Sequence, residues 1–229
     1  MKQNIEQVQD WLALSEGGYV NHPRDPGGAP NMGVTQRTYT QWLRSRGEPD
    51  RDVREINHHE AKKIFYDNYY KPVRFDDLPS GLDYAMADYS VNSGPGRAAK
   101  DLQRVLRDLG HDIAVDGHVG VGTLAAVNDE RGRVGDVVAA LVSRRWKFMT
   151  QLRHFKTFEG GWKKRLFGEM EGQQDWDSGV LDRALRMATE TPLPPRSTPR
   201  IHDTARSTES SMRVIPALIQ FLMRLFGHE

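Results

Sequence analysis

The 229-residue sequence predicts a mainly α-helical fold with one small irregular loop or β-hairpin. Apolar residues recur at helical spacing along most of the chain, and Gly or Pro residues bound the segments that carry this pattern. No run alternates apolar and polar residues as a half-buried strand does. Residues 17–33 are rich in Gly, Pro, Asn and Asp, a composition that favours tight turns or a small hairpin over a helix.

The first predicted helix begins after Asn4, a plausible N-cap, and ends at the pair Gly17-Gly18. One face of this helix is apolar and carries Ile5, Val8, Trp11 and Leu12. Glu16 therefore lies at the C-terminus of this helix, directly before the turn-rich segment.

Further helices are predicted by the same periodicity. The ranges are 36–46, 57–70, 80–92, 95–109, a helix that begins near Thr123, 134–152 and 178–188. Asn57-His58-His59-Glu60 has the pattern of a capping box, and Pro95 suits the first turn of its helix. Leu82, Met86 and Tyr89 are spaced to form one apolar face.

The composition changes after residue 189. Residues 190–211 are rich in Pro, Ser and Thr and are expected to form a linker. Residues 212–229 contain an apolar stretch, 212–226, which is shorter than the roughly 17 to 25 residues that span a bilayer as a helix. We expect this stretch to contact a membrane surface or a protein partner, the alternative being that it packs back on the domain.

Composition excludes several classes of function. The 32 basic and 31 acidic residues nearly cancel, so no nucleic-acid partner is expected, and the absence of cysteine excludes thiol catalysis and disulfides. No metal or nucleotide motif is present, and we expect no cofactor and a monomer. The N-terminus lacks the features of a secretory signal, so we expect synthesis in the cytoplasm. A substrate in the cell wall would then be reached after release or by non-classical export.

Two carboxyl groups suggest the chemistry. Glycoside hydrolysis generally needs one acid that protonates the leaving oxygen and a second carboxylate that activates water or attacks the sugar. Asp25 follows Glu16 by nine residues, within a segment able to fold back on the helix end. Partial burial and the negative end of the helix dipole would raise the pKa of Glu16, which suits a general acid. Asp25, in a polar loop, should stay ionised.

Three segments together resemble the signature of glycoside hydrolase family 108, the family of lysozyme-like muramidases and secretion activators. They are Ser15-Glu16-Gly17-Gly18-Tyr19-Val20-Asn21-His22-Pro23, Asp25-Pro26-Gly27-Gly28 and Asn31-Met32-Gly33-Val34-Thr35. The resemblance continues through Asp88-Tyr89-Ser90-Val91-Asn92-Ser93-Gly94-Pro95 and through residues 116–124, which are similar to the family's predicted peptidoglycan-binding region. It covers about residues 8–170.

The resemblance implies an α+β lysozyme-like fold and cleavage of the β-1,4 bond between N-acetylmuramic acid and N-acetylglucosamine. It implies a catalytic region over residues 1–94 and a helical peptidoglycan-binding region over 95–189, packed on the first. Glycan strands of peptidoglycan would be the partner. Related phage lysozymes are inverting enzymes with an Asp nine and a Thr fifteen residues after the Glu. Here the fifteenth residue is Asn31, and Pro30 stands where the family would have Thr.

The expected catalytic residues are therefore Glu16 as general acid, Asp25 as the water-activating carboxylate, and Asn31 as a residue that positions the water. The expected substrate-binding residues lie in the same matched segments and are Tyr19, His22, Thr35 and Asn92. For Asp25 the alternative is a turn-forming residue before Pro26, and for His22 a turn-stabilising role.

A second Glu-Gly-Gly-aromatic pattern occurs at Glu159-Gly160-Gly161-Trp162. No acid follows it at the corresponding spacing, so we expect Glu159 to be structural or ion-paired. His58 and His59 are adjacent and cannot form the i, i+4 pair of a metalloprotease, so we expect them to be solvated.

Basic residues are concentrated late in the chain. Eight of them lie between residues 144 and 165, against the single acid Glu159: Arg144, Arg145, Lys147, Arg153, Lys156, Lys163, Lys164 and Arg165. They form either a solvated helix face or a surface that attracts the carboxylates of peptidoglycan. The nearby Trp146, Phe155 and Trp162 are expected in the core rather than on a sugar-binding surface.

Two other functions fit the same residues. One is a peptidoglycan-binding, secretion-assisting adaptor that does not need catalysis, and the other is a chitinase-like glycosidase. The intact pair Glu16 and Asp25 argues against the adaptor, and the chitinase-like alternative stays open.

Overall fold

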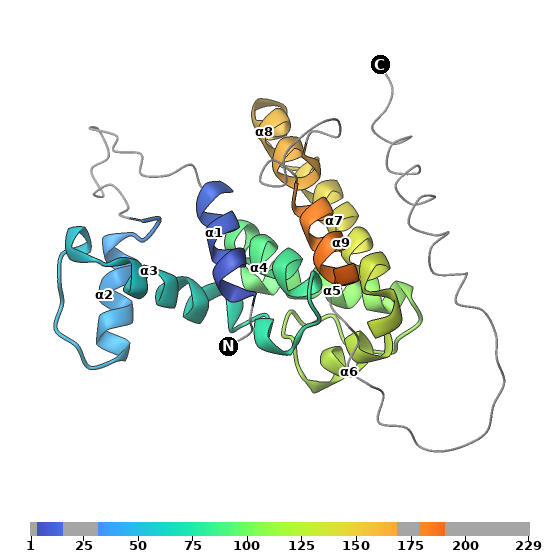
Figure 1. Cartoon of the computed structure of the whole chain (residues 1–229), viewed down its shortest axis with the longest axis horizontal. Helices are drawn as coiled ribbons and strands as arrows, with labels where there is room; N and C mark the ends of the chain where they lie inside the picture. Colours follow the sequence, from blue (N-terminus) through green and yellow to red (C-terminus); the bar gives the residue numbers. More distant parts are fainter. Residues whose placement is uncertain (1–3, 16–31, 169–178, 191–229) are drawn as a thin grey trace.

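The computed structural model describes residues 4–15, 32–168 and 179–190, and these residues are almost entirely helical (Figure 1). The α-helices are α1 (Ile5–Ser15), α2 (Gln36–Ser45), α3 (His58–Phe65), α4 (Leu82–Ser93), α5 (Pro95–Asp108), α6 (Val121–Asp129), α7 (Val134–Met149), α8 (Phe155–Phe167) and α9 (Val180–Glu190). Short helical turns are η1 (Val53–Glu55), the π-helical η2 (Tyr66–Tyr70), η3 (Phe75–Asp77) and η4 (Arg131–Arg133). The prediction of a mainly helical fold is confirmed.

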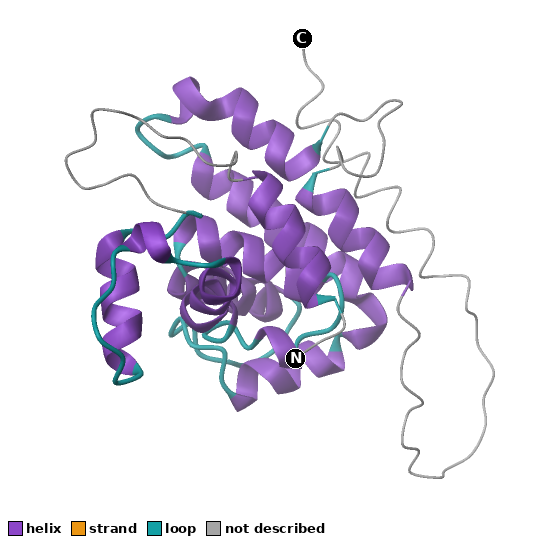
Figure 2. Ribbon diagram, turned by 60° about the vertical axis from the view of Figure 1, so that its left-hand side comes forward, coloured by secondary structure: helices purple, strands orange, loops and turns teal. Residues whose placement is uncertain are grey.

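Within the described ranges no strand is formed, as the ribbon in Figure 2 shows. The predicted hairpin falls almost wholly in residues 16–31, outside those ranges. The same is true of the linker from residue 191 onward and of the apolar stretch 212–226. None of the described helices is long and apolar enough to cross a membrane.

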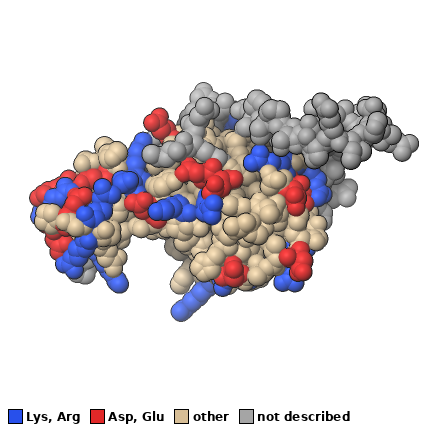
Figure 3. All heavy atoms as spheres, turned by 90° about the horizontal axis from the view of Figure 1, so that it is seen from below, with Lys and Arg blue, Asp and Glu red and all other residues tan. Residues whose placement is uncertain are grey.

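The described chain has two hydrophobic cores. The smaller core joins α2, η1 and α3 around buried residues such as Tyr39, Leu43 and Ile64. The larger core draws residues from α1, α4, α5, α6, α7, α8 and α9. Figure 1 shows the α2–α3 lobe at one side of the molecule and α1 between it and the main body. Viewed from below in Figure 3, the small lobe carries closely interleaved charges of both signs, and the outline narrows where it joins the body.

Helix α4 is the centre of the main body. Residues Leu82–Ser90 are all buried, because α5, α7 and α9 pack around this helix. The prediction of a single apolar face on α4 was therefore too narrow. Gly81, just before the helix, has φ +87°, and a Cβ there would lie 2.2 Å from the carbonyl oxygen of Ala184. Only glycine allows α9 to approach the start of α4 this closely.

Most predicted helix boundaries agree with the structure to within a few residues. Helix α8 is the exception, because the sequence pattern did not predict it. Gly160 and Gly161 lie in its interior, although a glycine pair usually ends a helix. The packing of Leu166 in the main core, a tertiary contact, helps to hold this helix in place.

Candidate functional site

Helix α1 is fixed firmly to the main body. Ile5, Val8 and Leu12 are buried in the larger core, as their predicted shared face requires. The ring of Trp11 packs against Tyr84 of α4, with the ring centroids 5.0 Å apart. On α9, the Arg183 guanidinium lies 5.1 Å from the centroid of the Trp11 ring. The helix that leads to Glu16 is thus held by contacts with α4 and with α9.

The start of α1 is also tied to α4. The backbone carbonyl of Asn4 accepts a hydrogen bond from the Val8 amide at 3.0 Å, as expected of the residue before a helix. Asn4 thus has the predicted N-cap position, but its side chain does not cap the helix, because Oδ1 accepts no hydrogen bond and the side-chain amide donates to Asp83 Oδ2 at 2.7 Å. Asp83 is buried, and its other oxygen accepts from the backbone amides of Gly81 and Tyr84. The side chain of Asn4 therefore serves a tertiary contact.

The residues that precede α2 have an unusual backbone. Met32 and Gly33 have φ values of +52° and +76°, so two successive residues adopt the left-handed region. A Cβ on Gly33 would lie 3.1 Å from Cζ of Phe65. Thr35 follows as the N-cap of α2, its hydroxyl accepting from the Thr38 amide at 3.2 Å. The backbone just before Thr35 is thus a left-handed turn at Met32 and Gly33, and Gly33 lies against Phe65 of α3.

The predicted site residues fall mostly in the segment between these two anchors. Glu16, Tyr19, His22, Asp25 and Asn31 lie outside the described residues, and their roles stay predictions. Of the two flanking residues, Ser15 ends α1, and Met32 packs against the smaller core.

The other two predicted site residues are described. Thr35 is exposed and caps α2. Asn92 is exposed in the last turn of α4. Substrate binding by these two residues also stays a prediction.

The small lobe is joined to the body by α3 and η2, with Phe65 packed against both cores. Trp42 of α2 donates its indole N–H to Asp67 Oδ2 at 3.1 Å, and Ser90 of α4 donates to the Tyr69 carbonyl at 2.8 Å. A longer contact of 3.4 Å runs from Gln9 Nε2 to the Lys62 carbonyl. These contacts set the orientation of the lobe relative to α1.

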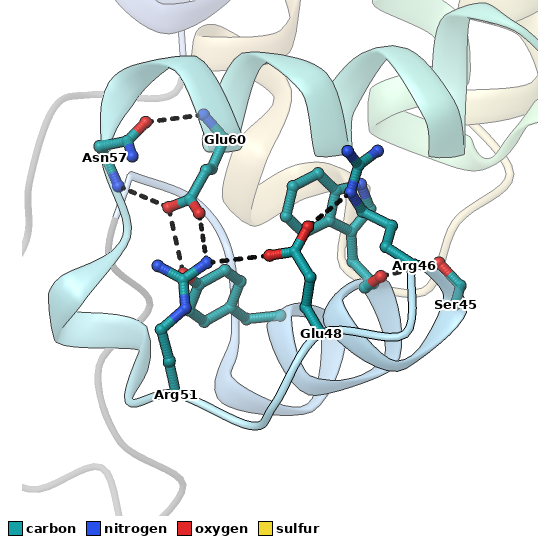
Figure 4. Close-up of polar contacts among 8 residues, drawn as sticks. Ser45, Arg46, Glu48, Arg51, Asn57 and Glu60 are labelled. Carbon is teal, nitrogen blue, oxygen red and sulfur yellow. Dashed lines mark hydrogen bonds and ion pairs between the residues drawn. The ribbon is translucent and has the colours of Figure 1, made fainter.

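A buried carboxylate organises the small lobe, as Figure 4 shows. The Glu60 carboxylate accepts hydrogen bonds from Arg51 Nη2 at 2.5 Å, from the Tyr39 hydroxyl at 3.1 Å and from the backbone N–H of Asn57 at 3.2 Å. The side-chain oxygen of Asn57 in turn accepts from the backbone N–H of Glu60, so the predicted capping box is confirmed. Burial alone raises the pKa of Glu60, but Arg51 and the other donors outweigh it, and the pKa is lowered.

A second buried carboxylate, Asp88 of α4, joins the two parts of the chain. It accepts from Arg145 Nη1 of α7 at 2.6 Å and from Arg165 Nη2 of α8 at 3.0 Å. Burial raises the pKa of Asp88, but the two guanidinium charges outweigh that effect, and the pKa is lowered. The interpretation of the basic cluster as a solvated or ligand-facing surface was therefore wrong for these two arginines, which are buried or nearly so.

Tyr84, whose ring packs on Trp11, also feels the charges of Asp88 and Arg183. Burial and, secondarily, the charge of Asp88 raise the pKa of the Tyr84 hydroxyl to about 12, against the opposing effect of Arg183. Tyr84 thus remains protonated at neutral pH. Sequence reasoning did not identify Tyr84, Arg183 or the partners of Asp88. The two arginines that bind Asp88 lie 57 and 77 residues away along the chain, and no local pattern reports such a pairing.

The glycine-rich loop that precedes α6 has a structural role. Gln103 of α5 is buried, and its amide donates to Asp116 Oδ1 at 2.8 Å and to the His118 carbonyl at 2.9 Å. Its oxygen accepts from the Gly117 amide at 2.9 Å. In the ranges that the structure describes, no three His, Asp or Glu side chains come together as a metal site.

The remaining predictions concern residues that were expected to have no catalytic role. Glu159 lies on the exposed part of α8, and His58 and His59 are exposed at the start of α3, as predicted for the two histidines. Trp146 is buried, and Phe155 and Trp162 pack against the larger core. The prediction that these three rings are core residues rather than an open sugar platform is supported by that packing.

Comparison with known proteins identifies the family. Residues 9–94 match the model of glycosyl hydrolase 108, and residues 97–167 match a predicted peptidoglycan domain. The structure of SagA from Brucella abortus is 34% identical, with a TM-score of 0.63, and the match covers 84% of this chain and 100% of that chain. The chain belongs to the glycosyl hydrolase 108 family. It matches none of the curated proteins with which it was compared.

The two matched regions meet between α4 and α5. The glycosyl hydrolase 108 model ends at Gly94, directly after α4, and the peptidoglycan match begins in α5; these two helices pack against each other. The glycosyl hydrolase 108 region thus contains both anchors of the segment 16–31, α1 on the body and Met32 on the small lobe.

Proposed function

We propose that this protein is a peptidoglycan glycosidase that cleaves the β-1,4 bond between N-acetylmuramic acid and N-acetylglucosamine. One observation carries the proposal. Glu16 directly follows a helix that Trp11, Tyr84 and Arg183 hold in place, within a region that matches glycosyl hydrolase 108. A general acid must be held in a defined position relative to the sugar, and an anchored helix end supplies that support.

Glu16 would protonate the leaving oxygen. It follows Ser15, the last residue of α1, in the sequence, so the negative end of the helix dipole would favour the protonated carboxyl that an acid needs. Asp25 would act as the ionised carboxylate that activates water, with Asn31 positioning that water. An inverting reaction would require about 6.5 to 9.5 Å between the two carboxyl groups. Tyr19, His22, Thr35 and Asn92 would line the groove for the glycan.

The first test compares two glutamates in the same sequence pattern. We expect Glu16→Gln to reduce release of reducing sugars from purified peptidoglycan by at least roughly a hundredfold, because the amide cannot donate the required proton. Glu159→Gln removes the same charge from the other Glu-Gly-Gly pattern and should leave the rate within about twofold of wild type. A Glu16→Gln variant that digests peptidoglycan at the wild-type rate would overturn the assignment.

The two alternative functions give different results in the same assay. An adaptor that needs no catalysis would bind peptidoglycan but release no reducing sugar as wild type. A chitinase-like enzyme would hydrolyse chitin oligomers at least as fast as peptidoglycan. The muramidase is expected to prefer peptidoglycan.

A further inference from the structure

The helix that joins the small lobe to the main body changes its winding where the two meet. It continues from α3 into the π-helical turn η2, in which the Lys71 N–H donates to the Tyr66 carbonyl, five residues back, at 2.9 Å. In Figure 1 this helix runs from the lobe toward α1. Turns of this kind are rare and occur frequently at functional sites. The residues of η2 are therefore candidates for a role beyond packing.

Tyr69 is held in this turn from two directions. Its ring packs beside that of Phe65, with the centroids 5.7 Å apart, and its backbone carbonyl accepts a hydrogen bond from Ser90 Oγ of α4 at 2.8 Å. The side chain is only partly buried against the larger core. The ring is thus fixed in position while part of its surface stays accessible.

The hydroxyl group of Tyr69 is not used within the described chain. Three other tyrosines donate their hydroxyl to a carboxylate, namely Tyr39 to Glu60, Tyr66 to Asp76 and Tyr89 to Asp101. No residue that the structure describes forms a hydrogen bond with the Tyr69 hydroxyl. A buried tyrosine hydroxyl usually finds a partner in the protein. The Tyr69 hydroxyl therefore remains available for a ligand.

Phe65 connects Tyr69 to the segment that holds the predicted catalytic residues. A Cβ on Gly33, just after that segment, would lie 3.1 Å from Cζ of Phe65, so the backbone there rests against this ring. On the other flank, Gln9 of α1 reaches the Lys62 carbonyl of α3. The helix that carries Phe65 and Tyr69 therefore contacts both flanks of the segment. These contacts place Tyr69 beside the proposed active site and not on a remote surface.

We propose that Tyr69 binds a sugar ring of the peptidoglycan glycan strand beside the active site, an inference that rests on the proposed function. The apolar face of the sugar would stack on the Tyr69 ring, which Phe65 supports. A hydroxyl or N-acetyl group of the same sugar would form a hydrogen bond with the Tyr69 hydroxyl. A sugar combines an apolar face with polar edges, and these two features of Tyr69 match both. Because tyrosine and phenylalanine are uncharged side chains, the site selects the sugar and not the carboxylates of the stem peptide.

The first test measures binding of a soluble tetrasaccharide of alternating N-acetylglucosamine and N-acetylmuramic acid by isothermal titration calorimetry. The full chain carries Glu16→Gln, which prevents digestion. We expect Tyr69→Phe, which loses only the hydrogen bond, to weaken binding about threefold. Tyr69→Leu also loses the stacking surface and should weaken binding by roughly tenfold or more. Binding by Tyr69→Leu as tight as that of the parent would overturn the site.

Tyr66→Phe is the matched control for Tyr69→Phe. It removes the same group from the same helical turn, but from a hydroxyl that is already bound to Asp76. The control should bind the tetrasaccharide as the parent does, and Tyr69→Phe should keep the parent's melting temperature because no contact within the described chain is lost. An equal loss of binding in both variants would overturn the inference, since a general disturbance of η2 would then explain it. Unchanged binding by Tyr69→Phe would overturn the hydrogen bond to the sugar.

The identity of the ligand is tested by competition and by salt. A free stem peptide without sugars should not displace the tetrasaccharide from the parent. The weakening caused by Tyr69→Phe should be the same at low and at high salt, because no charge is removed. Displacement by the peptide, or a weakening that disappears at high salt, would overturn the assignment to a sugar.

Kinetics with Glu16 intact separate binding from catalysis. We expect Tyr69→Phe to raise KM about threefold and to leave kcat within about twofold, because it alters substrate binding and not proton transfer. A fall in kcat at unchanged KM would overturn the binding role. Release of reducing sugars by the wild-type chain is measured separately. Its absence would overturn the glycosidase, whereas hydrolysis with an unchanged KM in both Tyr69 variants would overturn the sugar site alone.

Discussion

Asp88 shows how a single residue can join distant parts of a chain. It is fully buried, and a buried carboxylate is tolerated only when it is paired and hydrogen-bonded. Arg145 and Arg165 supply both the charge and the donors. Since the arginines come from α7 and α8, this one side chain links the glycosyl hydrolase 108 region to the helices of the peptidoglycan-domain match.

Removing the charge of Asp88 should therefore be costly. We expect Asp88→Asn to lower the free energy of unfolding by about 3–5 kcal/mol, because it leaves guanidinium groups buried without a counter-charge. Urea unfolding monitored by circular dichroism measures this. Asp108→Asn, which breaks the surface pair with Arg144, should change stability by less than about 1 kcal/mol. Similar losses in both variants would contradict the special role of the buried pair.

The same residue predicts a pH dependence. The pKa of Asp88 is lower in the folded protein than its ordinary value, so its ion pairs contribute stability above that ordinary value. The contribution is lost as pH falls through the lowered pKa. The difference in stability between wild type and Asp88→Asn should thus shrink as the solution is acidified. A difference that grew on acidification would have the wrong sign.

At the scale of elements, the start of α3 was readable from its sequence. A capping box depends on residues three apart, and the structure contains both of its hydrogen bonds. What the pattern could not reveal is that Glu60 also binds Tyr39 of α2 and Arg51 of the connecting loop. The cap of α3 is thereby part of the small-lobe core.

Asn57→Ala tests the capping contribution by itself. The variant removes the oxygen that accepts from the Glu60 amide, and we expect a loss of about 1 kcal/mol in the free energy of unfolding. Asn57→Asp keeps an acceptor and should lose less, and chemical denaturation distinguishes the two. Equal stability of Asn57→Ala and wild type would show that the Glu60 contacts alone hold this end of α3.

At the scale of the whole molecule, the two matched regions share one hydrophobic core. Helix α4 belongs to the first region, yet α5 and α7 of the second cover it, together with α9. Apolar residues on α4 such as Leu82, Met86 and Tyr89 would face water if the chain were cut after residue 94. The boundary between the matched regions is therefore not a boundary between independently folded units.

A fragment of residues 1–94 should accordingly fail to unfold cooperatively and should bind the dye ANS, since it exposes the buried faces of α4. A fragment of residues 1–190, which retains every residue of the described core, should unfold cooperatively with a midpoint near that of the full chain. Thermal scans and ANS fluorescence compare the two. Cooperative unfolding of the 1–94 fragment would contradict this expectation, because it would show that the apolar surface of α4 can be buried without α5, α7 and α9.

The sequence by itself determined the helical class, most helix boundaries, the capping box on α3, and a family resemblance that the comparisons confirm. These features depend on residues close together in the chain, where periodicity, caps and motif spacing act directly. Tertiary structure alone decided which charges are buried, that α8 is a helix despite its glycine pair, and that Trp11 is held between Tyr84 and Arg183. Those outcomes depend on which distant segments come into contact, because burial and charge pairing are properties of the packed molecule and not of any local stretch.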